Sequence, residues 1–191
     1  MNRSHSVIAL TGLAALLSCT DLLVKGLSIG LLGLITLTLC GLLLAPLRRV
    51  LQGNALLLAA LLIGGVLVSI AAVLLQLLSA ELYASLTLFL PLLLLPCLVL
   101  ALDQHGTALA GLKPGLIFAT LALLLGLLRE GFGQATLLRH ADWLFGPVAT
   151  GWPLSLANLN GVQLLTLAPG AFILLGLLLV AAHFFHHDDR P

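Results

Sequence analysis

The stretch NALLLAALLIGGVLVSIAAVLLQLL, from Asn54 to Leu78, contains no charged side chain and very few polar ones. A helix needs about 20 consecutive apolar residues to cross a hydrocarbon layer about 30 Å thick. This stretch is long enough to do so as one uninterrupted helix, with only Gly64 and Gly65 breaking the run of large apolar side chains. It therefore predicts that the chain lies in a membrane.

The composition of the whole chain supports this prediction. Hydrophobic residues make up 61% of the 191 residues and charged residues only 8%, and the mean hydropathy is +1.21. A soluble domain has about a quarter charged residues, so this chain lacks the polar surface that water requires. The composition excludes a soluble enzyme and indicates the lipid bilayer as a partner. With a net charge of +1, we do not expect the chain to bind nucleic acid.

Further apolar runs lie on both sides of the stretch Asn54–Leu78. They cover residues 7–24, 27–47, 82–102, 112–128 and 162–185, to within a few residues. The sequence thus predicts an all-α integral membrane protein of six transmembrane helices that form a single membrane domain over residues 1–191. The apolar run of the first helix stops at residues 18–21, and the fourth carries Pro91 and Pro96, so we expect both to be interrupted. Pro169 and Gly170 interrupt the sixth.

Between the fifth and sixth runs, residues 131–161 are more polar and include Trp143 and Trp152, which favour the membrane interface. Six spans place both termini on one side of the membrane. That side holds more positive charges, and cytoplasmic loops carry an excess of Lys and Arg, so we expect cytoplasmic termini. The side of the termini has Arg3, Arg48, Arg49, Lys113 and Arg190, against Lys25, Arg129 and Arg139 opposite.

The two halves of the sequence resemble each other. The segment LLSC at residues 16–19 matches LLPC at 94–97, and each is followed by an apolar run that ends in Leu-Arg. A unit of three spans must have the opposite orientation from the unit that follows it. The sequence therefore predicts two inverted-topology repeats, at about residues 7–78 and 82–185, with a functional site where they meet. The alternative is a chance alignment of leucine-rich helices.

Cys19 and Cys97 occupy equivalent positions in these repeats, where a helix is difficult to continue. The free amides at the end of a broken helix stabilise thiolates or an anionic cluster. An iron–sulfur cluster takes four ligands, so two thiolates from this chain would need a second chain to complete the site. The alternative is that buried cysteines are small apolar fillers, which is our interpretation of Cys40.

Other charged and histidine residues have simpler interpretations. Asp21 and Lys25, four residues apart, are spaced to form an ion pair, although a loop beginning at Asp21 is the preferred interpretation. Residues 129–130 (Arg-Glu) end the fifth run and indicate the membrane interface. His183, His186 and His187 have helical spacing and could bind a metal, but we favour a solvated tail.

The sequence contains no phosphate-binding glycine loop, serine triad or helical H-E-x-x-H site. We therefore expect no flavin or nucleotide site and no complete active site in this chain.

Four segments match a known family in order and spacing. They are LLSC at 16–19, SLTLFLPL at 85–92 leading to Cys97, LREGFGQATL at 128–137 and LAPGAF at 167–172. With these segments the chain resembles the Rnf/Nqr family of six-span membrane subunits, and most closely its RnfE/NqrD branch.

The resemblance implies a subunit of an ion-translocating electron-transport complex in the bacterial inner membrane, which couples electron flow to movement of Na⁺ or H⁺. It implies a partner, a homologous six-span subunit of opposite orientation (RnfA/NqrE-like), and a [2Fe–2S] cluster shared between the two. The ligands carried over to this chain are Cys19 and Cys97. The residues around them, Thr20-Asp21 and Leu95-Pro96, depart from the family pattern.

Two other functions are compatible with the sequence. One is a transporter of ions or small solutes that uses the inverted repeat without redox chemistry. A shortage of acidic residues within the spans argues against it, because ion-coupled carriers generally need such groups. The other is a structural paralogue that supports assembly of a complex and holds no cluster.

Overall fold

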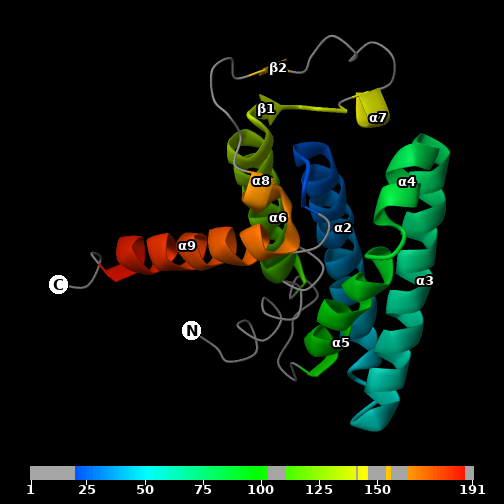
Figure 1. The fold of residues 1–191 in the computed structure, drawn as a ribbon. Helices are drawn as coiled ribbons and strands as arrows, with labels where there is room; N and C mark the ends of the chain where they lie inside the picture. Colours follow the sequence, from blue (N-terminus) through cyan, green and yellow to red (C-terminus); the bar gives the residue numbers. More distant parts are fainter. Residues whose placement is uncertain (1–19, 103–110, 141, 146–153, 156–162, 188–191) are drawn as a thin grey trace.

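The computed structural model describes residues 20–102, 111–140, 142–145, 154–155 and 163–187. Most of these residues are helical (Figure 1). Two strands of two residues each, β1 (Thr136–Leu137) and β2 (Leu154–Ser155), pair antiparallel. The helices are α2 (Leu23–Leu47), α3 (Asn54–Leu78), α4 (Ala80–Leu86), the 3-10 helix η1 (Leu90–Leu93), α5 (Leu94–Leu102), α6 (Leu112–Gln134), α7 (Asp142–Phe145), α8 (Gln163–Thr166) and α9 (Ala168–His187).

Three of these helices, α2, α3 and α6, are long and apolar enough to cross a membrane. Helix α4 and the segment Leu90–Leu102 meet at a bend of 65°. Taken together, they make a fourth span. The predicted membrane class is thus confirmed, and the bounds of α3 are those predicted. Most of the predicted first span, 7–24, lies outside the described residues, and the sixth contributes only the shorter apolar stretch Pro169–Leu178. The count of six stays a prediction.

Glycines bring α2 and α6 into close contact at the centre of the fold. A Cβ atom added to Gly26 would lie 2.7 Å from the carbonyl oxygen of Ala122, and one added to Gly30 would lie 3.2 Å from that of Ala119. The residue number of the contact partner on α6 decreases, from Ala122 to Ala119, as the residue number on α2 increases from Gly26 to Gly30. The two helices therefore run antiparallel. In the predicted inverted repeat, α2 and α6 are equivalent helices, and equivalent helices must run in opposite directions. The antiparallel packing is compatible with the repeat, which stays a prediction.

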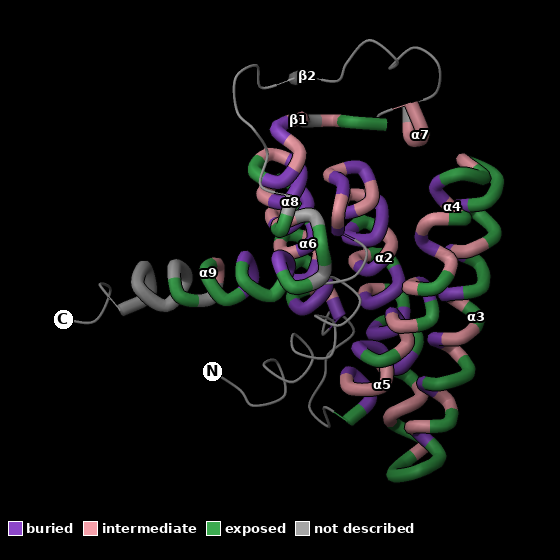
Figure 2. The backbone as a smooth tube through the Cα atoms, viewed as in Figure 1, coloured by how far each residue is buried: buried purple, intermediate pink, exposed green. Residues whose placement is uncertain are grey.

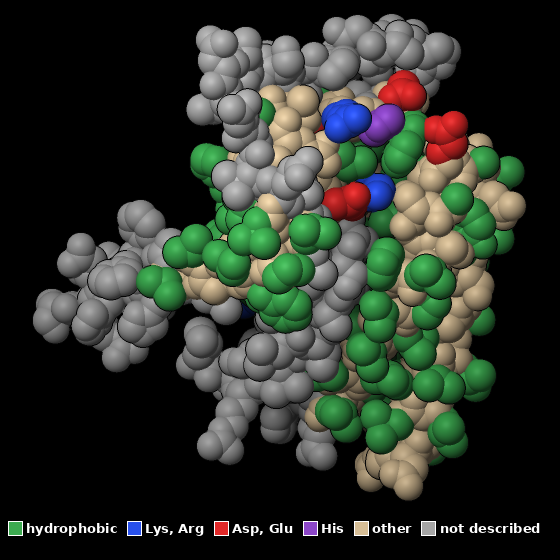
Figure 3. Space-filling view, viewed as in Figure 1, with side chains coloured by type: hydrophobic (Ala, Val, Ile, Leu, Met, Phe, Trp, Pro, Cys, Tyr) green, Lys and Arg blue, Asp and Glu red, His purple; other side chains and the backbone are tan. Residues whose placement is uncertain are grey.

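Helix α3 has a buried face and an outward apolar face (Figure 2). Its buried positions recur every three or four residues, as in Ala60, Gly64 and Val68. Leu58 and Leu62 on the other face are 63% and 68% exposed. Water would not favour such a surface, whereas hydrocarbon would, so this face is suited to lipid. On the face shown in Figure 3, hydrophobic side chains lie along the helices, and the Lys, Arg, Asp, Glu and His side chains visible on this face gather near one end.

The interruption of the fourth span is confirmed, but its predicted position beside Cys97 is wrong. The break lies between α4 and η1, and Pro91 falls in the first turn of η1. Cys97 is helical, in α5. Pro96 is tolerated because it lies in the first turn of α5, where a backbone N–H has no partner within the helix to lose.

Two other predicted boundaries also shift. Helix α6 does not end at Arg129 but continues to Gln134, since neighbouring segments satisfy the polar side chains in its last turns. In the sixth span the break falls at Leu167, because Pro169 fits in the first turn of α9. Trp143 is half-buried and stacks on His140, with ring centroids 4.5 Å apart. Trp152 lies outside the described residues.

Candidate functional site

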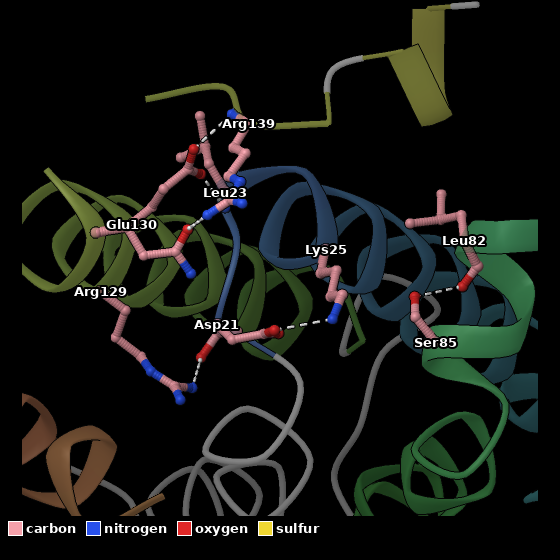
Figure 4. A network of polar contacts seen from close by, with 10 residues as sticks. Asp21, Leu23, Lys25, Leu82, Ser85, Arg129, Glu130 and Arg139 are labelled. Carbon is pink, nitrogen blue, oxygen red and sulfur yellow. Dashed lines mark hydrogen bonds and ion pairs between the residues drawn. The ribbon is translucent and has the colours of Figure 1, made fainter. Parts of the chain in front are cut away.

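Polar side chains gather around the start of α2 (Figure 4). We call Thr20, Asp21, Lys25, Arg129 and Glu130 the α2-start cluster. Residues 20–22 are not helical, as the sequence predicted for the end of the first span. The N-cap position of α2 is a leucine, which has no side-chain oxygen to accept the first backbone N–H groups of the helix. The acceptor must therefore come from another part of the chain.

Glu130 of α6 supplies that acceptor. Its Oε2 atom accepts a 2.7 Å hydrogen bond from the backbone N–H of Leu23, the first residue of α2. Its Oε1 atom accepts a 2.6 Å bond from the backbone N–H of Arg139. The side chain is fully buried, and both oxygens are used. A carboxylate at a helix N-terminus is also favoured by the helix dipole, so Glu130 acts as a cap from another helix.

The second bond of Glu130 holds a strained turn. Three residues after α6 have positive φ although they are not glycine: Ala135, Leu138 and His140, at 52°, 61° and 61°. Such backbone costs free energy and persists only where surrounding contacts enforce it. The bond from Arg139 to Glu130 lies between the last two of these residues, and it ties the turn back to α6.

Arg129, next to Glu130 on α6, serves different neighbours. Only 2% of its surface is exposed. Its Nε donates a 3.3 Å hydrogen bond to the Leu165 carbonyl in α8, and its Nη1 donates a 3.4 Å bond to the Thr20 hydroxyl. Arg129 thereby joins the non-helical segment before α2 to α8. Both side chains are buried in the protein, and the prediction that this pair lies at the membrane interface stays a prediction.

The predicted pair of Asp21 and Lys25 is confirmed, with 2.8 Å between Oδ2 and Nζ. The other interpretation also holds, since Asp21 lies in the bend before α2. Sequence reasoning missed the role of Glu130. The available signal was the absence of a capping side chain at the start of α2, which called for an acceptor from elsewhere in the fold.

Cys97 lies in the interior of the fold. It is fully buried in the first turns of α5 and packs against Gly64 of α3, where an added Cβ would lie 3.4 Å from the Cys97 Cβ. Its thiol lies close to the Cys40 thiol on α2. Both cysteines are free. The structure thus pairs Cys97 with a cysteine that we interpreted as an apolar filler.

The other predicted ligands are not tested by the structure. Cys19 lies outside the described residues. His183, His186 and His187 belong to α9, but their side chains are not among those described. Among the described residues, no group of three or more His, Cys, Asp or Glu side chains is placed to hold a metal ion.

Comparisons with known proteins agree over most of the chain. A family model described as "Rnf-Nqr subunit, membrane protein" matches residues 2–179. Similar proteins are named as the E-type subunit of an ion-translocating oxidoreductase complex. That of Pseudomonas paraeruginosa is 35% identical over 182 aligned residues, which cover 91% of this chain and 76% of the relative. That of Thioalkalivibrio sulfidiphilus is 32% identical, covering 93% and 82%, and that of Haemophilus ducreyi 30%, covering 95% and 84%.

Proposed function

The chain belongs to the Rnf-Nqr family of membrane subunits, and from this premise we propose that it is an E-type subunit of an ion-translocating oxidoreductase complex. In this proposal Cys19 and Cys97 provide two of the four ligands of a [2Fe–2S] cluster, and a homologous six-span subunit provides the other two. The complex sits in the bacterial inner membrane and couples electron flow to movement of Na⁺ or H⁺.

The observation that carries the proposal is the position of Cys97. It is a free, fully buried thiol in α5, in the part of the span that follows the break between α4 and η1. The donor atom also suits iron, which thiolates bind in such clusters. By the chemistry of its donor, Cys97 fits the proposed group.

When bound, the cluster would accept and donate single electrons. The chain would contribute a dry site, since Cys97 is surrounded by α2 and α3 and Gly64 leaves room for its Cβ. Cys40 would stay beside the liganding thiol as a close neighbour. The glycine contacts set the spacing between α2 and α6. They would thereby keep α2, which carries Cys40, in place beside the site.

Iron content tests the proposal. The full chain is co-expressed with its homologous partner, and iron and the visible spectrum are measured for the wild type and for Cys19→Ala, Cys97→Ala and Cys40→Ala. We expect the first two variants to lose the cluster and Cys40→Ala, a buried cysteine in the same protein, to keep it. Iron retained in both ligand variants would overturn the proposal. If iron is lost in Cys40→Ala and Cys97→Ala but kept in Cys19→Ala, the two ligands from this chain are Cys40 and Cys97.

The same measurement distinguishes the proposed function from that of a structural paralogue. If the chain only supports assembly and holds no cluster, the wild-type complex should contain no iron. The transporter alternative has less support. Among the described residues, the fully buried acid is Glu130, and both of its oxygens already accept backbone hydrogen bonds. An ion-carrying acid needs to exchange its partners, whereas this one caps a helix.

A further inference from the structure

A short non-helical segment, residues 20–22, separates the proposed ligand Cys19 from the first residue of α2. Thr20, the first residue of this segment, is fully buried. Successive Cα atoms lie about 3.8 Å apart, so the position of Thr20 limits where Cys19 can lie. Contacts that hold the segment therefore also restrict the proposed ligand.

Two adjacent residues of α6 hold this segment at both ends (Figure 4). At its start, Arg129 Nη1 donates a 3.4 Å hydrogen bond to the Thr20 hydroxyl. Just past its end, the Glu130 carboxylate accepts a 2.7 Å bond from the backbone N–H of Leu23. These partners are 109 and 107 residues apart in the sequence. The path of the segment is therefore set by α6 and not by its own sequence.

The two side chains of α6 are themselves held from behind. Arg129 Nε donates a 3.3 Å bond to the Leu165 carbonyl, and the second oxygen of Glu130 accepts a 2.6 Å bond from the Arg139 N–H. Both side chains are buried, where hydrogen bonds to charged groups are strong. Their positions are thus fixed on two sides.

Helix capping does not account for the whole arrangement. It explains the bond from Leu23 to Glu130, since α2 lacks a capping side chain of its own. It does not explain the bond from Arg129 to Thr20, because Thr20 lies outside α2 and next to Cys19. The second bond holds the residue that follows the proposed ligand.

We propose that Arg129 and Glu130 are positioning residues, which fix the segment after Cys19 and so place its thiolate for the cluster. This role rests on the proposed function, since it requires Cys19 to bind iron. Both oxygens of Glu130 already accept backbone hydrogen bonds, so it acts through the segment and not as a ligand. Replacing a group that orients a metal ligand typically weakens metal binding about 10–100-fold.

Two pairs of variants test this role in the complex of the full chain with its homologous partner. Thr20→Val removes the hydroxyl that Arg129 contacts, whereas Thr20→Ser keeps it. Glu130→Ala removes both acceptor oxygens, whereas Glu130→Gln keeps one. The measurements are the rate at which a ferrous chelator removes iron and the electron paramagnetic resonance spectrum of the dithionite-reduced cluster.

We expect Thr20→Val and Glu130→Ala to lose iron about tenfold faster than the wild type and to have an altered spectrum. Thr20→Ser should behave nearly as the wild type, and Glu130→Gln should be intermediate. If Glu130→Ala does not fold, the two variants of Thr20 decide the matter, because they leave Glu130 in place.

Leu75→Ala is the control for a general loss of stability. Leu75 is buried in α3, outside the α2-start cluster, and its truncation destabilises the fold by leaving a cavity. We expect this variant to keep the wild-type spectrum and rate of iron loss. A rate as fast as that of Thr20→Val would mean that any destabilisation releases iron, and would overturn the positioning role.

The remaining outcomes separate this role from the cluster proposal. If Cys19→Ala loses iron but Thr20→Val and Glu130→Ala keep both the iron and the spectrum of the wild type, Cys19 is a ligand and the positioning role is wrong. If the wild type holds no iron, or Cys19→Ala retains it, the assignment of Cys19 as a ligand fails, and the positioning role fails with it.

Discussion

The carboxylate of Glu130 in α6 accepts a 2.7 Å hydrogen bond from the backbone N–H of Leu23, and so caps the helix to which Leu23 belongs. The two residues come from different halves of the sequence. The start of α2 is therefore not defined by its own sequence but by contact with α6. This explains why Glu130, a charged residue, is kept on the buried side of α6.

Replacing Glu130 should cost more stability than replacing an exposed acid. Glu130→Ala removes the acceptor of the Leu23 and Arg139 amides, and an unpaired amide inside the fold costs about 1–3 kcal/mol, whereas Arg139 is exposed and its amide can bond to water. We therefore expect a loss of about 1–3 kcal/mol in the free energy of unfolding, measured by titration from mild detergent into SDS. Glu81→Ala is the control, because Glu81 is exposed in the first turn of α4 and should change stability by less than about 1 kcal/mol. Equal effects of the two substitutions would contradict the capping role.

The long helices were predictable because their signal is local. A continuous apolar run such as Asn54–Leu78 contains all that is needed to place a span, and its bounds agree with the structure. The role of Glu130 was not predictable in this way, since the partner of its carboxylate lies in a distant part of the sequence. Helix α6 also extends past the point where its apolar run stops, because tertiary contacts satisfy polar side chains that hydropathy assigns to a membrane boundary.

The close approach of α2 and α6 should tolerate no side chain at Gly26. A methyl group there would lie 2.7 Å from the Ala122 carbonyl oxygen, and backbone would have to move. Overpacking of this kind costs about 1–3 kcal/mol, so Gly26→Ala should lower the free energy of unfolding by that amount. Gly65→Ala is the matched control, because nothing lies within 4 Å of its added Cβ. The gain in helix propensity, about 0.5–1 kcal/mol, should make that variant neutral or slightly more stable. A destabilised Gly65→Ala with an unaffected Gly26→Ala would refute the packing.

The ion pair of Asp21 and Lys25 should contribute little. Its Nζ–Oδ2 distance is 2.8 Å, but the Asp21 and Lys25 side chains are 34% and 15% exposed, and Asp21 lies in the bend before α2. Pairs of this kind couple by about 0.3–1 kcal/mol. A double-mutant cycle with Asp21→Asn and Lys25→Met should give a coupling energy in this range, and it should fall at high salt. A coupling above about 2 kcal/mol that does not respond to salt would indicate a pair shielded from water.

The thiol pair shows a second limit of sequence reasoning. The repeat drew attention to Cys97, which is buried in α5, but it gave no reason to consider Cys40, which lies in a continuous apolar run. Contacts between helices depend on how each helix is rotated about its axis, and a helix that is apolar on all sides does not reveal this rotation in its sequence. The neighbour of Cys97 could therefore be found only in the folded chain.

The nearness of Cys40 and Cys97 should be detectable by oxidation of the isolated chain. The two thiols lie close together and both are free, so diamide in excess should convert them into a disulfide, with loss of two protons and two electrons to the diamide. Alkylation after unfolding should then modify one cysteine in place of three, and peptide mass spectrometry should find 40 joined to 97. Cys40→Ser should leave both remaining thiols open to alkylation, whereas Ser28→Ala, a change at another buried polar position of α2, should not prevent the link. A disulfide that instead joins Cys19 to Cys97 would show that these two proposed ligands approach each other more closely than Cys97 approaches Cys40.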